Sequence, residues 1–354
     1  MTISIKVGNR KIGPNHPCFI IAEAGVNHNG KIELAHQLIE TASKCKVDAI
    51  KFQSFISEEL TISTAQKANY QIITTGKSGN QLKMLKSLEL TPDQQKELKQ
   101  HCDDVNLIYL CTPYEEASLR MLIKMRVSAI KIAATDTNNT PYLKKIANSG
   151  LPTILSTGMS SLAEIEQAVN ILQKNGLNNK ISLLQCTSEY PAPFEDINLR
   201  AITTLQHAFG CPVGFSDHTN GIGASPWAVA CGACIIEKHF TLDKTMRGPD
   251  HRASIEPNEL MELVKIIRNV ELSLGDGIKK VMPSELKNKP LMQKSLVAKK
   301  NIKTGQIIRE DDITCKRPGI GLQPYWYDQI LHKRAKGNIL KNTLITLDKI
   351  EWVD

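Results

Sequence analysis

The chain has 354 residues, 41% hydrophobic and 23% charged, which is the composition of an ordinary globular protein with room for one large domain or two. No stretch approaches the roughly eighteen consecutive apolar residues of a transmembrane helix, so we expect no membrane span. The net charge of +8 comes from scattered lysines without a basic run, which argues against a nucleic-acid partner.

The amino-terminal residues and the cysteines both favour a cytoplasmic protein. Residues 1–17, MTISIKVGNRKIGPNHP, lack the apolar core of a signal peptide. The nine cysteines are odd in number, and several lie inside apolar runs, where reduced cysteine acts as a small hydrophobe.

Short apolar runs rich in β-branched residues recur along the chain, and each predicts a buried strand. In order they are CFIIA (18–22), DAIKF (48–52), NLIYL (106–110), SAIKI (128–132), PTILS (152–156), ISLLQ (181–185), CPVGF (211–215) and ACIIE (233–237).

Most of the intervening segments predict amphipathic helices with recognisable ends. Thr91 and Ser161 are typical N-caps, with Gln94 and Glu164 three residues later as partners in capping boxes. Pro257 opens the last helix of the series, which is predicted over 258–275. The connection over 54–90 is the longest, and since long loops of barrels are usually functional or disordered, we expect it to cover part of the site.

Eight buried strands alternating with helices over roughly 250 residues predict an α/β protein with a (β/α)₈ TIM barrel. A doubly wound sheet is the competing fold, but it usually has a glycine-rich phosphate turn after its first strand, and GVNHNG does not match that pattern. We therefore predict a barrel domain over 1–277, a polar linker over 278–294 and a small, mostly β domain over 295–354.

Polar side chains lie at the end of each predicted strand, where TIM barrels build their active sites. In chain order they are Glu23, Lys51 with Gln53, Thr112, Lys131 with Asp136, Ser156, Ser188 with Tyr190, Ser216 with His218, and Glu237 with His239. A lone lysine or histidine in such a place is more often structural, but the convergence of two of each on one rim favours a site.

The residue types at this rim indicate their chemistry. Two lysines with neighbouring hydroxyls suit a phosphate or carboxylate group. Two histidines at the ends of adjacent strands could share one divalent metal ion with open positions for water and substrate, and Asp217 or Glu237 could add a ligand or orient one.

The same residues lie in motifs that resemble those of a known family. IAEAGVNHNG, IKFQSF, LSTGM, QCTSEYPAPFEDINL, GFSDHT and IEKHFTLDK follow one another as in the sialic acid synthase family of nonulosonic acid synthases, and KSLVAKKNIKTGQII resembles its antifreeze-like (SAF) domain. The resemblance implies a transferase that condenses phosphoenolpyruvate with an open-chain N-acylated mannosamine-type sugar, releasing phosphate.

The resemblance also implies roles for individual residues. Glu23 would be the acid/base, and His218 and His239 would hold a divalent metal, Mn²⁺ by preference with Mg²⁺ or Co²⁺ as alternatives. Phosphoenolpyruvate would be surrounded by Lys51, Thr112, Lys131, Ser156, Ser188, Tyr190 and Ser216, and the sugar by Gln53, Asp136, Asp250 and Arg317. The family further implies a domain-swapped homodimer in which Arg317 of one protomer completes the site of the other.

The identity of the sugar stays open at this stage. N-acetylmannosamine, giving N-acetylneuraminate, is the first expectation, and 2,4-diacetamido-2,4,6-trideoxymannose, giving diacetyllegionaminate, is the alternative. Asp136 stands where bacterial members more often have glutamate. The shorter aspartate resembles the animal enzymes, which take a 6-phosphorylated sugar. Ser188 replaces a longer amide side chain that some members have. A metal-dependent pyruvate aldolase, which would release no phosphate, and a carbohydrate- or ice-binding module on an inactive barrel are the remaining alternatives.

Overall fold

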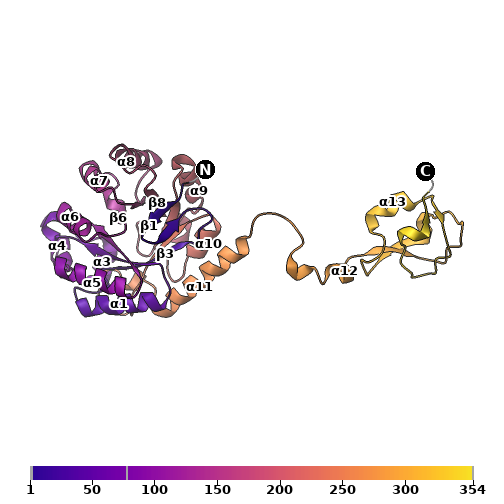
Figure 1. Ribbon diagram of the computed structural model, residues 1–354. Coiled ribbons are helices and arrows are strands. Elements are labelled where there is room, and N and C mark those ends of the chain that lie inside the picture. Colours follow the sequence, from indigo (N-terminus) through magenta and orange to yellow (C-terminus); the bar gives the residue numbers. More distant parts are fainter. Residues whose placement is uncertain (1–2, 77–78, 353–354) are drawn as a thin grey trace. The chain divides into compact units, whose positions relative to one another are not determined.

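The computed structural model describes residues 3–76 and 79–352, in two compact units, Met1–Gly275 and Asp276–Asp354. The first unit is built on one eight-stranded sheet with the order β5-β4-β3-β10-β9-β8-β7-β6. Its strands pair in parallel, and β10 pairs with β3, which joins the last strand to the first. The two strands at the ends of this order, β5 and β6, lie next to each other, so the sheet curls into a barrel (Figure 1).

Each of the eight predicted strands is found in the sheet. They are β3 (Phe19–Gly25), β4 (Ala49–Ser54), β5 (Ile108–Pro113), β6 (Ile130–Ile132), β7 (Thr153–Ser156), β8 (Ile181–Cys186), β9 (Val213–Asp217) and β10 (Ile235–His239). Alternate residues point to opposite faces, so Ile20 packs among the helices while Ile21 fills the barrel. Both faces are buried, which explains the continuous apolar runs.

Eight helices surround the sheet within the described residues. They are α1 (Ile32–Lys44), α5 (Pro92–Asp104), α6 (Glu116–Lys124), α7 (Thr140–Ala147), α8 (Leu162–Lys174), α9 (Arg200–Phe209), α10 (Ser225–Ala230) and α11 (Pro257–Leu274). The Thr91 and Ser161 hydroxyls accept hydrogen bonds from the backbone N–H groups of Gln94 and Glu164, so both predicted capping boxes are confirmed. The α/β barrel itself is confirmed.

A hairpin that we did not anticipate precedes the barrel. Strands β1 (Ile5–Val7) and β2 (Arg10–Ile12) pair antiparallel. Their apolar side chains pack with Phe19 of β3 and with other side chains inside the barrel near the amino-terminal ends of the strands. The hairpin thereby closes the end of the barrel opposite the predicted site.

The long connection between β4 and β5 contains short helices, α2 (Ser57–Leu60), α3 (Asn69–Thr75) and α4 (Gln81–Lys86). Short 3-10 turns follow three of the strands, η1 (Ala134–Asp136), η2 (Phe194–Asp196) and η3 (His251–Ala253). These segments lie at the carboxyl ends of the strands and shape the rim of the barrel.

The second unit has its own core, which includes Leu296, Ile308, Ile330 and Ile345. Its strands are short: β11 (Ser295–Ala298) pairs with β12 (Ile313–Lys316), and β13 (Arg334–Ala335) pairs with β14 (Ile350–Glu351), all antiparallel. Further elements are η4 (Pro283–Glu285), α12 (Lys289–Met292), η5 (Glu310–Asp312), η6 (Pro324–Trp326), α13 (Tyr327–Ile330) and η7 (Leu347–Lys349). Within the described residues, no helix is long and apolar enough to span a membrane.

Candidate active site

Four charged side chains alternate in sign inside the barrel, at the carboxyl ends of its strands. Lys51 Nζ lies 3.1 Å from Glu23 Oε2 and 3.7 Å from Glu237 Oε2, and Lys131 Nζ lies 3.6 Å from Glu237 Oε1. All four side chains are buried. Buried charges are tolerated only when paired, so the row Glu23–Lys51–Glu237–Lys131 is one electrostatic unit.

Burial acts on the pKa of each member, and the neighbours decide the net direction. Burial raises the pKa of Glu23 to about 7, because Glu237 adds to this effect and Lys51 only partly opposes it. Burial also works to raise the pKa of Glu237, but Lys131 and Lys51 outweigh it and the pKa is lowered. Glu23 is therefore the carboxyl that can both give and take a proton near neutral pH.

The pKa values of the two lysines also shift in opposite directions. Burial disfavours the charged form of Lys51, but Glu23 and Glu237 outweigh it, so the pKa of Lys51 is raised. For Lys131 burial prevails over the attraction of Glu237, and its pKa is lowered.

Hydroxyl groups from neighbouring strands surround the lysines. Lys51 donates to Thr112 Oγ1 (3.1 Å) and Lys131 donates to Ser156 Oγ (2.7 Å). Ser216 Oγ donates to Glu237 Oε1 (3.1 Å). The predicted lysines and these three hydroxyls are thus brought together, and two ammonium groups with adjacent O–H donors can bind an anion.

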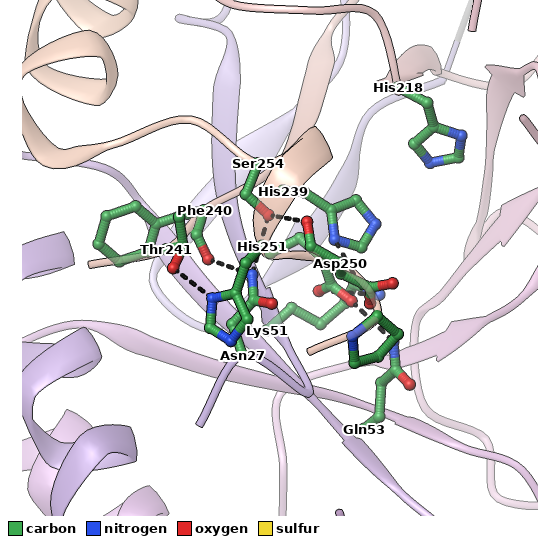
Figure 2. Close-up of polar contacts among 12 residues, drawn as sticks. Asn27, Lys51, Gln53, His218, His239, Phe240, Thr241, Asp250, His251 and Ser254 are labelled. Atoms are coloured by element: carbon green, nitrogen blue, oxygen red, sulfur yellow. Dashed lines mark hydrogen bonds and ion pairs between the residues drawn. The ribbon is translucent and has the colours of Figure 1, made fainter. Parts of the chain in front are cut away.

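The two histidines lie side by side above this group. His218, just after β9, and His239, at the end of β10, have ring centroids 5.5 Å apart (Figure 2). Tyr190 packs against both rings, at 4.2 Å and 5.4 Å between centroids. Burial lowers the pKa of His218 to about 4, and burial together with His218 lowers that of His239, so both rings are neutral at physiological pH.

This pair of rings fits a divalent metal ion. His218 Nδ1 lies 2.7 Å from the Thr187 carbonyl, which can only accept a hydrogen bond, so Nε2 keeps its lone pair. His239 Nδ1 is buried 4.0 Å from Asp250 Oδ2, and no described residue forms a hydrogen bond with it. Within the described residues, no cluster of three or more His, Cys, Asp or Glu side chains could hold a metal. The two rings could offer a metal ion two nitrogens, which is fewer than the ligands it needs, so water and substrate would have to supply the others.

Asp217, which the sequence offered as a further ligand or as a residue that orients one, does not point toward this pair. Asp217 points to the outer face of the barrel, where it is fully buried against Lys238, because side chains alternate along β9. Glu237 faces inward but contacts the lysines and Ser216.

Gln53, Asp136 and Asp250, three of the four side chains predicted to meet the sugar, lie around the same opening. Gln53 Nε2 donates to Glu23 Oε1 (3.3 Å), and Asp136 Oδ1 accepts from Asn139 (2.9 Å). Burial raises the pKa of Asp136, and it raises that of Asp250 to about 6 against the opposing effect of Lys51.

The backbone around Asp250 is fixed by a buried network that sequence patterns did not reveal (Figure 2). Asn27 donates to the Phe240 carbonyl (2.8 Å) and to Ser254 Oγ (2.9 Å), and Ser254 Oγ donates to the Asp250 carbonyl (2.7 Å). This network ties the loop after β3 to the segment that follows β10.

Two further predicted residues, Ser188 and Arg317, make contacts of their own. The Ser188 hydroxyl lies against Gly158, and Ser188 lines a cavity of about 580 Å³ with Thr157 and Glu189. Arg317 belongs to the second unit, where it is exposed and its Nε donates to the Met292 carbonyl (2.9 Å).

The long connection after β4 covers part of the rim. Tyr70 of α3 packs against Tyr190, with ring centroids 5.0 Å apart, and Thr74 Oγ1 donates to the Pro249 carbonyl (3.3 Å). A cavity of about 270 Å³ lies between these residues and Arg252. Tyr114, which we did not single out, lies near these carboxylates: burial raises its pKa, with contributions from Glu23, Asp136 and Asp250.

Comparisons with known proteins agree with the motifs. The model of the NeuB family matches residues 38–279, and the model of the SAF domain matches residues 293–351. The chain is 49% identical to N,N'-diacetyllegionaminic acid synthase of Campylobacter jejuni, over 92% of this chain and 98% of that protein. It is 40% identical to human N-acetylneuraminate-9-phosphate synthase, over 87% of this chain and 85% of that protein.

A solved structure gives the same picture. The N-acetylneuraminic acid synthetase of Leptospira borgpetersenii, crystallised with citrate, is 39% identical and superimposes with a TM-score of 0.73, over 81% of this chain and 95% of that one.

Proposed function

The chain belongs to the NeuB family, and several of its relatives are named as synthases; we propose that this enzyme condenses phosphoenolpyruvate with an open-chain N-acylated mannosamine-type sugar. The products are a nine-carbon α-keto acid and inorganic phosphate. The observation that carries the proposal is the buried row Glu23–Lys51–Glu237–Lys131 beside two neutral histidines at one barrel mouth.

We infer that 2,4-diacetamido-2,4,6-trideoxymannose is the physiological sugar, which reverses the order of our expectations from the sequence. The 49% identity to a diacetyllegionaminic acid synthase supports it. N-acetylmannosamine is the second candidate, supported by the 39% identity to a sialic acid synthetase. A 6-phosphorylated sugar is less favoured, although a relative named for the 9-phosphate product is 40% identical.

Phosphoenolpyruvate would bind across the two lysines. Its phosphate and carboxylate need donors that stay charged, and Lys51, with its raised pKa, is the stronger of the two. Thr112, Ser156 and Ser216 would donate their hydroxyls to the same oxygens, in exchange for the contacts they make now.

His218 and His239 would hold the divalent metal ion, Mn²⁺ by preference, and the ion would polarise the aldehyde of the sugar. The neutral state of both rings supports this role, because an imidazolium cannot ligate a cation. Tyr190, packed on both rings, would keep them oriented and limit the access of water.

Glu23 would move the protons at C2 of phosphoenolpyruvate. As C3 forms its bond to the aldehyde carbon, C2 becomes electron-poor and accepts a water molecule, whose proton passes to Glu23. The same carboxyl then returns that proton to the bridging oxygen as the C2–O bond breaks and phosphate leaves. The hydroxyl left at C2 loses its own proton as it becomes the keto group, and this balances the proton that the oxygen of the former aldehyde takes up. A pKa of about 7 suits both transfers.

The sugar would lie against Gln53, Asp136 and Asp250, and we propose that Arg317 reaches it from the second protomer of a domain-swapped dimer. The segment that precedes β11 exposes apolar side chains, with Ile278 66%, Leu286 59% and Leu291 63% accessible, which suits burial against a second copy of the chain.

Mixing two inactive variants tests this dimer. His218→Ala and Arg317→Ala are combined under conditions that exchange subunits. In a swapped heterodimer, one site combines an intact barrel with an intact Arg317, so activity should return. If each site is built from one chain, every site keeps a lesion and the mixture stays inactive.

The reaction is tested by phosphate release from phosphoenolpyruvate with a panel of sugars. We expect the highest kcat/KM with the diacetamido sugar. A higher value with N-acetylmannosamine would favour the second candidate. Product formed from pyruvate, without phosphate, would instead identify an aldolase. Because phosphoenolpyruvate is made in the cytoplasm, we propose that location, and the nine free cysteines are compatible with it.

A further inference from the structure

The ends of β9 and β10 carry matched residues on both faces of the barrel. Their register pairs Glu237 with Ser216 and Lys238 with Asp217. Ser216 and Glu237 face inward and are hydrogen-bonded, so the next residue of each strand faces outward. The residue after that is a histidine in both strands, and these two histidines meet on the inner side.

The outward residues form an ion pair that is fully buried. Lys238 Nζ lies 3.2 Å from Asp217 Oδ1, and both side chains are 0% exposed. The ammonium also donates to the Thr219 carbonyl (2.5 Å). This pair therefore links β10 both to β9 and to the loop that carries His218.

The carboxylate of Asp217 organises that loop. Its Oδ1 accepts from the N–H (2.8 Å) and the hydroxyl (2.7 Å) of Thr219, and its Oδ2 accepts from the N–H (3.0 Å) and the hydroxyl (2.6 Å) of Ser225. Gly223 closes the loop at φ +61°, where an added Cβ would come within 1.9 Å of Thr219 Oγ1. The backbone on both sides of His218 is thus fixed by one side chain.

The position of the His239 ring depends even more on the backbone than that of His218. His218 is held by the Thr187 carbonyl, whereas His239 Nδ1 has no hydrogen-bond partner among the described residues. Besides the packing of Tyr190, the His239 ring is placed by the chain around it, by Lys238 before it and by the hydrogen bond from Ile255 N–H to its own carbonyl (2.8 Å). A shift of Lys238 would move this ring relative to His218.

We propose that Asp217 and Lys238 are positioning residues that set the separation of His218 and His239, and thereby their affinity for a divalent cation. The inference rests on the proposed function, which assigns the cation to these two histidines. A buried ion pair is weak support for stability in itself, and fixing one arrangement is the best-attested use of such a pair.

The test measures Mn²⁺ binding to the metal-stripped full-length protein, from the electron paramagnetic resonance signal of free Mn²⁺. The variants are Asp217→Asn, Lys238→Met and the double variant, and the melting temperature of each is recorded. Arg268→Met is the matched control, because it removes an ion pair with Asp48 (3.3 Å) at the opposite end of the barrel, just before β4.

We expect each single variant to weaken Mn²⁺ binding by about 10-fold or more. The double variant should lose less Mn²⁺-binding free energy than the sum of the losses in the two single variants, because the two residues act as a unit. The Mn²⁺ affinity of Arg268→Met should stay within about twofold of the wild-type affinity, whatever its melting temperature, because Arg268 lies far from the histidines.

The other outcomes separate the inference from the function. Lower melting temperatures with unchanged Mn²⁺ affinity would overturn the inference and leave the synthase proposal intact. A wild type that releases phosphate without binding Mn²⁺ would overturn both the metal assignment and the inference. If the charge variants do not fold, Ser225→Ala removes one donor to Asp217 and should weaken binding about threefold, and an unchanged affinity there would also overturn the inference.

Discussion

Replacing Glu23 by glutamine should change how the stability of the barrel depends on pH. Burial raises the pKa of Glu23 from its ordinary value of 4.5 to about 7. Between these values the unfolded chain has released the proton and the folded chain keeps it, so the free energy of unfolding falls as the pH rises. A shift of about 2.5 units corresponds to about 3 kcal/mol, lost between pH 4.5 and pH 7 and not beyond.

Glutamine has no proton to release at this position. The free energy of unfolding of Glu23→Gln, relative to the wild type, should therefore rise by about 3 kcal/mol between pH 4.5 and pH 7.5. Urea denaturation followed by circular dichroism measures both proteins at each pH, and the subtraction cancels the groups they share. Glu166→Gln, at an exposed position of α8, is the control and should show no such rise.

A difference that stays constant within about 0.5 kcal/mol, or that falls with pH, would refute the reasoning. Glu23 would then titrate near its ordinary value, and a poised acid/base at this position would have no basis.

Three further predictions follow from the site. His218→Ala and His239→Ala should fold but lose nearly all activity, and a chelator should abolish wild-type activity until Mn²⁺ is added; full activity of metal-stripped enzyme would contradict this. Lys51→Met should raise the KM for phosphoenolpyruvate far more than the KM for the sugar, whereas equal effects would indicate a general structural role. Hydrogen exchange in α3 (Asn69–Thr75) should slow when substrates bind, because Tyr70 and Thr74 lie over the rim, and unchanged exchange would argue against a lid.

The barrel could be predicted because its signals are local. Each strand is a continuous apolar run, and helix starts such as Thr91 and Ser161 are marked by short capping motifs. The hairpin over residues 5–12 was missed because its three-residue strands are too short to show a period, and only burial against Phe19 gives them a role.

The site could be predicted only in part, for a related reason. The strand ends indicate which residues lie at the same rim of the barrel. Which of these residues touch one another depends on how the strands close into the barrel, and the sequence does not show that. Glu237 lies between Lys51 and Lys131, which come from strands that are not its neighbours in the sequence. The choice between a ligand and an orienting role for Asp217 could not be made, because a residue just after a strand's last apolar position can face either way until the register is known.

The most direct measurement of the central proposal is the stoichiometry of the reaction with phosphoenolpyruvate and 2,4-diacetamido-2,4,6-trideoxymannose. We expect one phosphate released for each α-keto acid formed, detected by a phosphate assay and by mass spectrometry, and no phosphate when either substrate is omitted. Phosphate released without the sugar, or keto acid formed without phosphate, would contradict the proposal.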